Sequence, residues 1–380
     1  MRPLCLAFLC TIGLGSAGCD SSSRPTPDQQ QQSAHNPAAE APVAPAAAEL
    51  TEEQKKAAET LRATGAQLAE NSAGQITEVN LGDIEATDAL ATQIALLDQL
   101  EKLTIRESAM TGDGWQALGK LHALQQLDLR DCPLDNAQLT AVVADLRQLR
   151  ALRLNGTSGR TSVDDDGMAA LANCPELKVL AVDGLWVGGQ GLEHLKKNLK
   201  LSELYASGTT LDDDAVVVLA DLPALRKLRL SRTTVGTEGL AALANLKLED
   251  LDVSEASSIN DQTLAIIGKM KSLKRLNLWR DTITDAGVEQ LAGLTQLEWL
   301  NVDNTHLTDA GLPYLKDMAS LKFLHLGSTG VTDEGMPALV ALKSLKDLKV
   351  TRTAVTEAGT EIVKQAIPGI NVQLKYIEGE

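Results

Sequence analysis

Two runs of aspartate are the first residues in this sequence whose type and spacing suggest chemistry. The runs 164–166 and 212–214 each offer three adjacent carboxylates, the ligand type that Ca²⁺ prefers. Each run also stands where related segments of the chain begin a helix with Thr-Asp, as at Thr284 and Asp285. Acidic residues there stabilise the positive end of a helix dipole. We therefore expect helix capping, with a cation site as the alternative, and predict no metal site.

No set of catalytic residues can be assigned from the sequence. Four histidines lie in the body of the chain, at His122, His194, His306 and His325, and none can be placed in a Ser-His-Asp or Cys-His set. The motifs G-x-x-x-x-G-K and H-E-x-x-H are absent from the sequence. Of the five cysteines only Cys132 and Cys174 lie beyond residue 19, and no C-x-x-C occurs. We expect a protein that is not an enzyme and uses no cofactor.

The composition of the chain restricts which partners it can bind and what kind of hydrophobic core it can form. The formal net charge is −16, so no basic excess exists to neutralise phosphates and we predict no nucleic-acid partner. Hydrophobic residues make up 44% of the 380 residues but aromatic residues only 2%. The core must therefore be aliphatic, and a chain of this length can build such a core by repetition.

A short pattern of leucines recurs with two alternating periods. Leu273, Leu276 and Leu278 have the spacing L-x-x-L-x-L, and Leu297, Leu300 and Val302 repeat it 24 residues later. The L-x-L piece has period two and predicts a short strand. Between the two copies, the segment 284–291 has helical spacing, and its first residue is a threonine suited to cap a helix.

Twelve such units can be counted, followed by a closing strand. They begin at Ile76, Leu100, Leu124, Leu149, Leu177, Leu201, Leu225, Leu248, Leu273, Leu297, Leu321 and Leu345, and the closing strand starts at Ile370. The pattern resembles the leucine-rich repeat family, in a bacterial form close to its cysteine-containing class. The resemblance implies an α/β solenoid, curved, with parallel strands on the concave face and short helices on the convex face.

The same resemblance gives a role to the ninth position of each unit. In that class the residue is Cys, Thr or Asn, buried and hydrogen-bonded to the backbone of the turn. It would here be Cys132, Thr157, Thr209, Thr233, Thr305, Thr329 and Thr353, while Leu185, Ala256 and Asp281 depart from the pattern. Cys132 is then a structural residue. The unit that begins at Leu149 carries four extra residues, which we place at 158–161 as a surface loop.

The first nineteen residues indicate export. Arg2 precedes an apolar run from Leu4 to Leu14, and Ser16-Ala17-Gly18 lead to Cys19. This segment resembles the signal peptide and lipobox of bacterial lipoproteins, which implies lipidation of Cys19 and attachment to a membrane of the cell envelope. Ser16 departs from the usual leucine, so simple secretion is the alternative.

The rest of the chain divides into three parts. Residues 20–49 are rich in Pro, Ala, Gln and Ser and predict a disordered tether. Residues 50–72 open with a capping box, Thr51 to Gln54, and predict an N-terminal capping helix that runs to about Glu70. Residues 73–380 form the repeat domain.

Outward-facing positions of the strands suggest a contact surface. The third, fifth and seventh residues of L-x-x-L-x-L-x-x point away from the leucines, so they form columns across the units. Aromatic residues and arginines collect in the later columns, which is the composition of many interface centres. The candidate partner-binding residues are Tyr205, Arg229, Arg275, Asn277, Trp279, Arg280, Trp299, Asn301, Phe323 and His325.

Charges elsewhere on the same face alternate in sign, as with Lys102 and Arg130 against Glu78 and Asp128. A mixed face suits a protein surface better than a polyanion, although cross-strand pairing for solubility would also explain it. We expect a lipid-anchored, non-enzymatic envelope protein that binds a protein, or a glycan, through its concave face. The alternative is a structural spacer of the envelope without a specific ligand.

Overall fold

The recurring L-x-L pieces form one large sheet. The computed structural model describes residues 50–375, so the predicted signal peptide, Cys19 and the tether lie outside the described residues. The sheet has fourteen strands. They are β1 (Gln67–Glu70), β2 (Ile76–Asn80), β4 (Lys102–Thr104), β6 (Gln126–Asp128), β7 (Ala151–Asn155), β8 (Val179–Asp183), β9 (Glu203–Tyr205), β10 (Lys227–Arg229), β11 (Asp250–Asp252), β12 (Arg275–Asn277), β13 (Trp299–Asn301), β14 (Phe323–His325), β15 (Asp347–Lys349) and β16 (Asn371–Gln373).

The return half of each unit is a short helix, and a two-stranded sheet joins β3 (Glu85–Ala86) to β5 (Glu107–Ser108). The α-helices are α1 (Glu52–Ala63), α2 (Asp88–Ala95), α3 (Gly112–Leu118), α4 (Asn136–Val143), α5 (Asp165–Met168), α6 (Gly189–Glu193), α7 (Asp213–Val216), α8 (Thr237–Leu243), α9 (Asp261–Ile267), α10 (Asp285–Gln290), α11 (Met336–Leu339) and α12 (Glu357–Ala366). Four segments are 3₁₀ helices: η1 (Ala169–Asn173), η2 (His194–Lys197), η3 (Val217–Asp221) and η4 (Leu312–Leu315).

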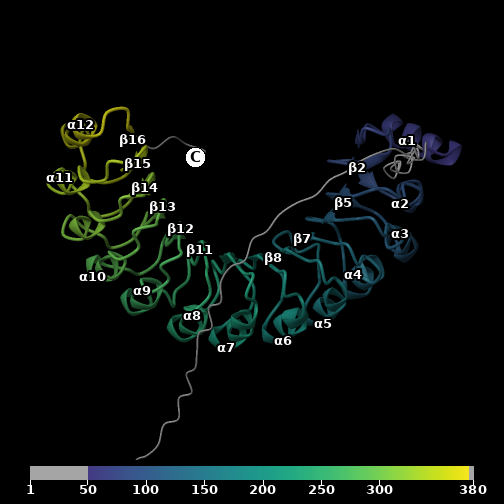
Figure 1. Cartoon of the computed structure of the whole chain (residues 1–380), viewed down its shortest axis with the longest axis horizontal. Helices are drawn as coiled ribbons and strands as arrows, with labels where there is room; N and C mark the ends of the chain where they lie inside the picture. The colour runs from purple at the N-terminus through teal and green to yellow at the C-terminus, as the bar shows by residue number, and fades with distance from the viewer. Residues whose placement is uncertain (1–49, 376–380) are drawn as a thin grey trace, which may run out of the picture. The chain divides into compact units, whose positions relative to one another are not determined.

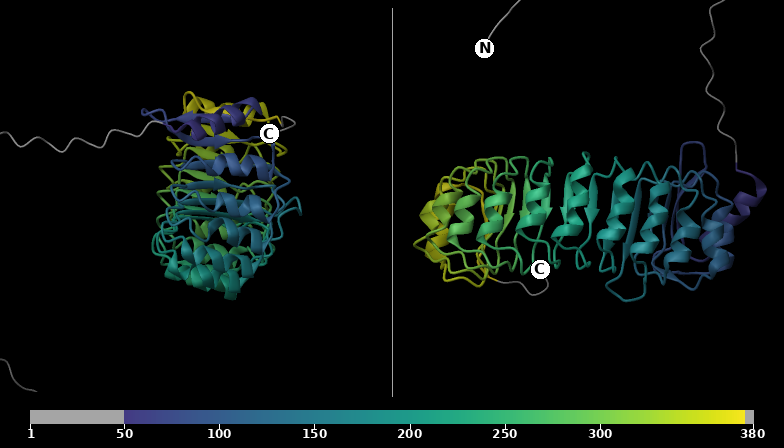
Figure 2. Two further views of the ribbon diagram at one scale, coloured as in Figure 1. Left: turned by 90° about the vertical axis from the view of Figure 1, so that its right-hand side faces the viewer. Right: turned by 90° about the horizontal axis from the view of Figure 1, so that it is seen from below.

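From β2 to β16 every strand pairs in parallel with the strand of the next unit, and equivalent positions stand opposite each other. Leu276, Leu300 and Leu324 therefore form one row, and each is fully buried. Helices need more lateral room than strands, so the array of residues 50–375 curves with its strands on the concave side and its helices on the convex side (Figures 1 and 2). The predicted leucine-rich solenoid is confirmed.

The N-terminal cap differs from the sequence prediction. The capping box is present, because Gln54 N donates to Thr51 Oγ1 at 3.2 Å and Thr51 N donates to Gln54 Oε1 at 3.0 Å. The helix, however, ends at Ala63 rather than near Glu70. Gly65 adopts a positive φ of 92°, and the chain then returns as β1, which pairs antiparallel with β2. The cap is thus a helix plus an edge strand, since β2 has a free edge that a strand can satisfy.

A ladder of aspartate and threonine ties successive units together where the helices begin. Asp261 accepts hydrogen bonds from the backbone N and the hydroxyl of Thr284, at 2.8 and 2.7 Å. The same two bonds, at 2.6–2.8 Å, join Asp88 to Thr111, Asp285 to Thr308, Asp309 to Thr332 and Asp333 to Thr356. Bonds from Thr356 lower the pKa of the Asp333 carboxyl. Each Thr-Asp pair therefore links its own unit to both neighbours.

The glycine of T-D-x-G is needed for space rather than for an unusual backbone conformation. A Cβ added at Gly287 would overlap Asp261 Oδ1, and Gly114, Gly335 and Gly359 meet the preceding aspartate in the same way. Residues 164–166 and 212–214 belong to the same scheme. Asp164 and Asp212 accept bonds from helix N–H groups, while Asp165 and Asp213 accept from the backbone N of Gly188 and Gly236. The predicted capping role of both runs is confirmed.

The turn after each strand uses the eighth and ninth positions. The eighth residue has a positive φ, at Asp131, Gly184, Gly208, Arg232, Glu255, Arg280, Asn304, Ser328 and Arg352. At the ninth position the hydroxyls of Thr209, Thr233, Thr305, Thr329 and Thr353 donate to the carbonyl three residues earlier, at 2.6–2.8 Å. The buried Cys132 thiol instead donates to Ile105 O at 3.3 Å. The predicted structural role of this position is confirmed at these residues.

Thr157 is an exception, and the prediction for it is wrong. Its side chain is exposed, whereas Thr161 is buried and donates through its hydroxyl to Cys132 O at 2.8 Å. The four extra residues are therefore 157–160 rather than 158–161, because the burial of a ninth-position residue fixes the register of the turn. The extra loop is held against an earlier unit by an ion pair between Arg160 and Glu107 at 2.5 Å.

Asp281 occupies the ninth position of its unit and is only 2% exposed. Its Oδ1 accepts a bond from Ala256 N at 3.1 Å, while its Oδ2 has no hydrogen-bond partner. Burial raises the pKa of this carboxyl to about 8, and the nearby carboxylates Asp252 and Glu255 raise it further while the Ala256 bond opposes the shift. The sequence marked Asp281 as a departure from the pattern, and the structure places a buried carboxyl with a raised pKa where other units have a threonine hydroxyl.

Candidate functional site

The outward columns of the concave face lie in register, as the leucine spacing predicts. Arg275 stands opposite Trp299, which stands opposite Phe323. One step along each strand pair, Asn277, Asn301 and His325 form a second column. The side chains of both columns are partly or fully exposed, because the alternate positions carry the buried leucines.

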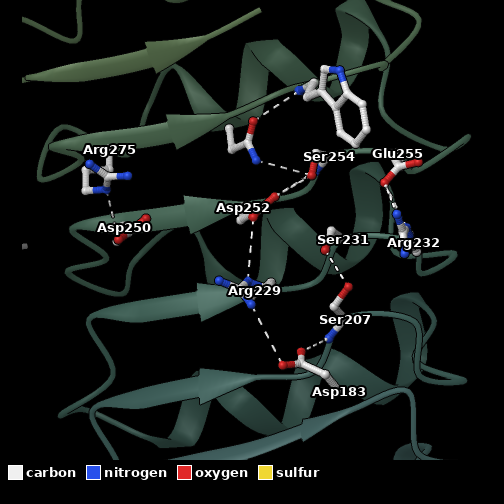
Figure 3. Close-up of polar contacts among 12 residues, drawn as sticks. Asp183, Ser207, Arg229, Ser231, Arg232, Asp250, Asp252, Ser254, Glu255 and Arg275 are labelled. Carbon is white, nitrogen blue, oxygen red and sulfur yellow. Dashed lines mark hydrogen bonds and ion pairs between the residues drawn. The ribbon is translucent and has the colours of Figure 1, made fainter. Parts of the chain in front are cut away.

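The first column is a continuous stack. The Arg275 guanidinium lies 4.4 Å from the centre of the Trp299 ring, and the rings of Trp299 and Phe323 are parallel within 6° at 5.0 Å. His325 meets Phe323 edge-on at 6.4 Å. An ion pair with Asp250, at 3.3 Å, holds Arg275 from the other side (Figure 3). Each contact contributes roughly 0.5–1.5 kcal/mol, so the stack presents a flat, ordered aromatic surface.

The second column is polar and fixes the turns beside it. Asn277 accepts a bond from Trp279 N at 3.3 Å and donates to Ser254 Oγ at 3.3 Å. Asn301 accepts from Asp303 N at 3.0 Å. Burial lowers the pKa of His325, an effect that Asp303 opposes and Lys349 reinforces. The neutral imidazole can therefore accept or donate a hydrogen bond at pH 7.

Trp279 and Arg280 form the rim of this surface. The Arg280 guanidinium lies 5.4 Å from the centre of the Trp279 ring. Arg280 and Arg232 also share one carboxylate, since both pair with Glu255, at 3.3 and 2.7 Å. Figure 3 shows the shared Glu255 beside Arg232. One carboxylate for two guanidinium groups leaves a local excess of positive charge.

Tyr205 and Arg229 lie four and three units before Trp299 but border the same hollow. Arg229 lies 5.1 Å from the centre of the Tyr205 ring, and it pairs with Asp183 and Asp252 at 3.8 and 3.6 Å (Figure 3). The Tyr205 hydroxyl donates to Glu203 at 2.7 Å, and burial together with this bond raises the pKa of the phenol to about 12. Tyr205 thus acts as a hydrogen-bonded aromatic group and not as a proton donor at neutral pH.

Two hollows collect nearly all of the predicted residues. The first, of about 100 Å³, is lined by Tyr205, Arg229, Arg275, Asn277 and Trp299 together with Lys227, Asp250 and Asp252. The second, of about 520 Å³, is lined by Trp279, Arg280, Asn301 and His325 together with Asp303, Asn304, Ser328, Lys349, Thr351, Arg352 and Gln373. Phe323 stands in the column between them. The structure therefore brings the ten residues into one surface.

The sequence prediction missed one column of this surface. Asn304, Ser328 and Arg352 line the second hollow from the eighth position, next to Arg280. All three residues, like Arg280, have a positive φ. The 24-residue repeat contained this signal, because Arg280 and Arg352 are three units apart at the same position. The sequence prediction also passed over Trp186, which is 78% exposed and lies outside both hollows.

Charges in the N-terminal half of the concave face pair with one another. Lys102 pairs with Glu78 at 3.5 Å, and both Arg106 and Arg130 pair with Asp128, at 3.4 and 2.8 Å. The hydrogen bonds from Arg130 hold the pKa of Asp128 below its usual range despite burial. Cross-strand pairing therefore accounts for the mixed charge of this half without a ligand.

Neither cysteine of the described residues is a reactive nucleophile. Both are buried and free, and burial raises the pKa of the Cys132 and Cys174 thiols to about 12 and about 11. Their thiols are protonated at neutral pH, and thiols are far weaker nucleophiles than thiolates. Within residues 50–375, no helix has the length and apolar content needed to cross a bilayer.

Comparisons with known proteins agree with the repeat architecture. A family model described as "Leucine Rich repeat" matches residues 222–244 and 318–340. Among solved structures, an internalin from Listeria monocytogenes is 17% identical, covers 86% of this chain and 95% of its own, and superposes with a TM-score of 0.61. A leucine-rich-repeat protein from Leptospira interrogans is 16% identical and covers 74% of this chain and 80% of its own, with a TM-score of 0.49.

At these identities the internalin likeness establishes the fold alone, and the lower TM-score of the Leptospira protein adds nothing to it. No curated protein matches the sequence. The chain contains leucine-rich repeats and folds as a leucine-rich-repeat solenoid.

Proposed function

We propose that this chain is a lipid-anchored protein of a bacterial cell envelope that binds a protein partner through the concave face of its C-terminal half. The stacked side chains of Arg275, Trp299 and Phe323 carry the proposal. Aromatic residues are 2% of the chain, yet two of them stack face to face on an outward column of the sheet. Ordered aromatic groups beside arginines supply much of the binding energy in protein interfaces.

Binding would be noncovalent and would need little change of shape. Side chains of the stack are already held by Asp250, by each other and by the paired strands. Because few rotamers remain to be frozen, the entropy lost on association is small. A glycan is the second candidate ligand, since a flat aromatic surface flanked by asparagines also suits a sugar ring.

Loss of the stack should abolish partner binding. The purified protein, immobilised and exposed to envelope extracts, should retain a partner that the double variant Trp299→Ala, Phe323→Ala binds at least ten-fold more weakly. Trp186→Ala is the matched control, because it removes a more exposed tryptophan elsewhere in the array. If the parent, the double variant and Trp186→Ala retain every protein equally, the stack does not contribute to partner binding.

The spacer role is a second candidate function, and the paired charges of the N-terminal half favour it. Those ion pairs explain the polar concave face by solubility alone. A spacer would keep its envelope phenotype in the double variant, whereas a binding protein would lose it. Measuring that phenotype alongside capture separates the two functions.

The anchor is proposed from the sequence of residues 1–19. Lipidation of Cys19 would place the membrane at the start of the segment 20–49, which would act as a tether for the repeat domain. Cells fed an alkynyl fatty acid should incorporate the label into this protein, and Cys19→Ala should lose the label and enter the soluble fraction. If the wild-type chain is not labelled, residues 1–19 direct simple secretion without a lipid anchor.

A further inference from the structure

The second hollow has a composition unlike the rest of the molecule. It extends across β12 to β16 along the C-terminal ends of these strands, and its walls carry Trp279 and ten polar or charged residues. Three of the lining residues are cations, Arg280, Lys349 and Arg352, and one is an anion, Asp303. The whole chain has a formal charge of −16. Arg280 also pairs with Glu255 at 3.3 Å, and with that carboxylate counted the cations still outnumber the anions, which suits an acidic ligand.

The side chains of Asp303, His325 and Thr351 line the hollow and form its floor, where they pack closely around Gly327. A Cβ added at Gly327 would lie 2.7 Å from Asp303 Oδ1, 2.9 Å from His325 Nε2 and 2.9 Å from Thr351 Oγ1. Gly327 does not have a positive φ, so its backbone does not require glycine. Glycine is needed here because any larger residue would displace these three side chains.

The arginines of the rim stand in backbone conformations that disfavour them. Arg280 and Arg352 have φ values of 59° and 56°, in the left-handed region where glycine and asparagine are the usual residues. Asn304 and Gly208 occupy the same position in other units. Seven described non-glycine residues share this conformation, so the turn of the repeat requires it, and it places Arg280 and Arg352 at equivalent points of the array.

The distance between Arg280 and Arg352 along the array sets the spacing that acidic groups on a ligand would need. Arg280 follows β12 and Arg352 follows β15, so they are three strand spacings apart, or roughly 14 Å. In an extended peptide, side chains four residues apart lie on one face and are separated by roughly 13 Å. The residue midway between them would face the floor at Gly327, where Asp303, His325 and Thr351 can accept a hydrogen bond.

We propose that the second hollow binds an acidic segment of the partner protein, laid in extended form across the strands, with two carboxylates four residues apart. One carboxylate meets Arg280 beside Trp279, and the other meets Arg352 and Lys349. A hydroxyl or amine on the middle residue fits the floor. This inference rests on the proposed protein-binding function and gives the chemistry of the segment that is recognised.

A defined peptide array tests the inference without the native partner. Eleven-residue peptides of glycine and serine carry two glutamates at spacings of two to six residues, with matched glutamine peptides as controls, and are probed with the full chain. Spacing four should bind at least ten-fold more tightly than the glutamine peptide and more tightly than every other spacing. The preference should weaken as the salt concentration rises, because the contacts are between exposed charges.

Two variants locate the binding. Arg280→Gly and Arg352→Gly should each lose the glutamate preference at least ten-fold while their unfolding temperature stays the same or rises, because glycine relieves the positive φ. Arg130→Gln, on the concave face of the N-terminal half, is the control and should bind as the parent does. Gly327→Ala should weaken binding, because its Cβ would displace the Asp303, His325 and Thr351 side chains of the floor.

Three outcomes would overturn the proposal. The first is equal binding of glutamate and glutamine peptides at every spacing, which leaves the proposed function intact if capture still depends on Trp299 and Phe323. The second is preferential binding of an oligogalacturonate, which would assign the hollow to a glycan. The third is binding that appears only in a chain ending at Lys375, which would assign the hollow to Glu378 and Glu380 of this same chain.

Discussion

Replacing Asp281 with threonine should stabilise the protein, and the gain should grow between about pH 4 and pH 8. Burial raises the pKa of this carboxyl from 3.8 to about 8. One unit of pKa shift corresponds to about 1.36 kcal/mol, so the full shift corresponds to roughly 6 kcal/mol. Threonine is the residue that five other units use at this position, with a hydroxyl that donates to the carbonyl three residues earlier.

The direction of this pH dependence follows from the number of protons that the folded and unfolded chains bind. Between pH 4 and pH 8 the unfolded chain has ionised Asp281, whereas the folded chain keeps it protonated. Folding therefore takes up a proton, and the free energy of unfolding falls as the pH rises through this window. Above about pH 8 the folded carboxyl also ionises and the loss stops. Threonine has no such group, so its advantage is small near pH 4 and largest near pH 8.

Thermal unfolding followed by circular dichroism at pH 4, 6 and 8 measures the effect. Asp281→Asn should behave like Asp281→Thr, because an amide is neutral and can still accept the bond from Ala256. Asp317→Asn is the control, since this aspartate is exposed and its removal should leave the pH dependence of the parent unchanged. If Asp281→Thr keeps the parental slope, the buried carboxyl is not protonated in the folded state.

Gly287→Ala should destabilise the protein by roughly 2–4 kcal/mol, against the ordinary preference of helices for alanine. Gly287 is buried in α10, and its added Cβ would overlap Asp261 Oδ1 and lie 3.0 Å from Leu264 Cδ1. The methyl group would displace the carboxylate that accepts two bonds from Thr284. Steric overlap and the loss of those bonds act in the same direction.

Two further variants show whether the carboxylate is the cause. Gly112→Ala, at the first turn of α3, has no atom within 4 Å of the added Cβ and should be neutral or stabilise by about 0.5–1 kcal/mol. In the double variant Gly287→Ala, Asp261→Ala the space is vacant, so the two effects should fall well short of their sum. Urea unfolding gives the four free energies. Additive effects would mean that Gly287 is required for another reason.

The fold and the strand register were predictable because the same leucine spacing recurs in every unit. The period-two leucines fix each strand, and burial of the same face in every unit aligns Leu276 with Leu300 and Leu324. Predictions failed where the rule is interrupted. The cap has no leucine repeat, so nothing in its pattern separates a helix from the strand Gln67–Glu70. In the long unit either Thr157 or Thr161 could take the buried ninth position. Only the geometry of the turn shows that Thr161 takes it.

The candidate site was predictable as columns but not as hollows. Strand alternation places Arg275, Trp299 and Phe323 on one face, and their aromatic and basic character indicates contact. The second hollow is lined in part by Asn304, Ser328 and Arg352, whose positive φ is set by the turn after each strand. The protonation state of Asp281 depends on burial and on Asp252 and Glu255, which come from another unit.

Strict register from β2 to β16 has a consequence for how recognition can diversify. The separation of Arg280 and Arg352 is a whole number of strand spacings, so duplication or loss of one unit between them would change it by about 4.8 Å. Such a step corresponds to roughly one and a half residues of an extended peptide. If Arg280 and Arg352 bind the two ends of a ligand as proposed, selectivity for ligand length would evolve in discrete increments without any change to these side chains.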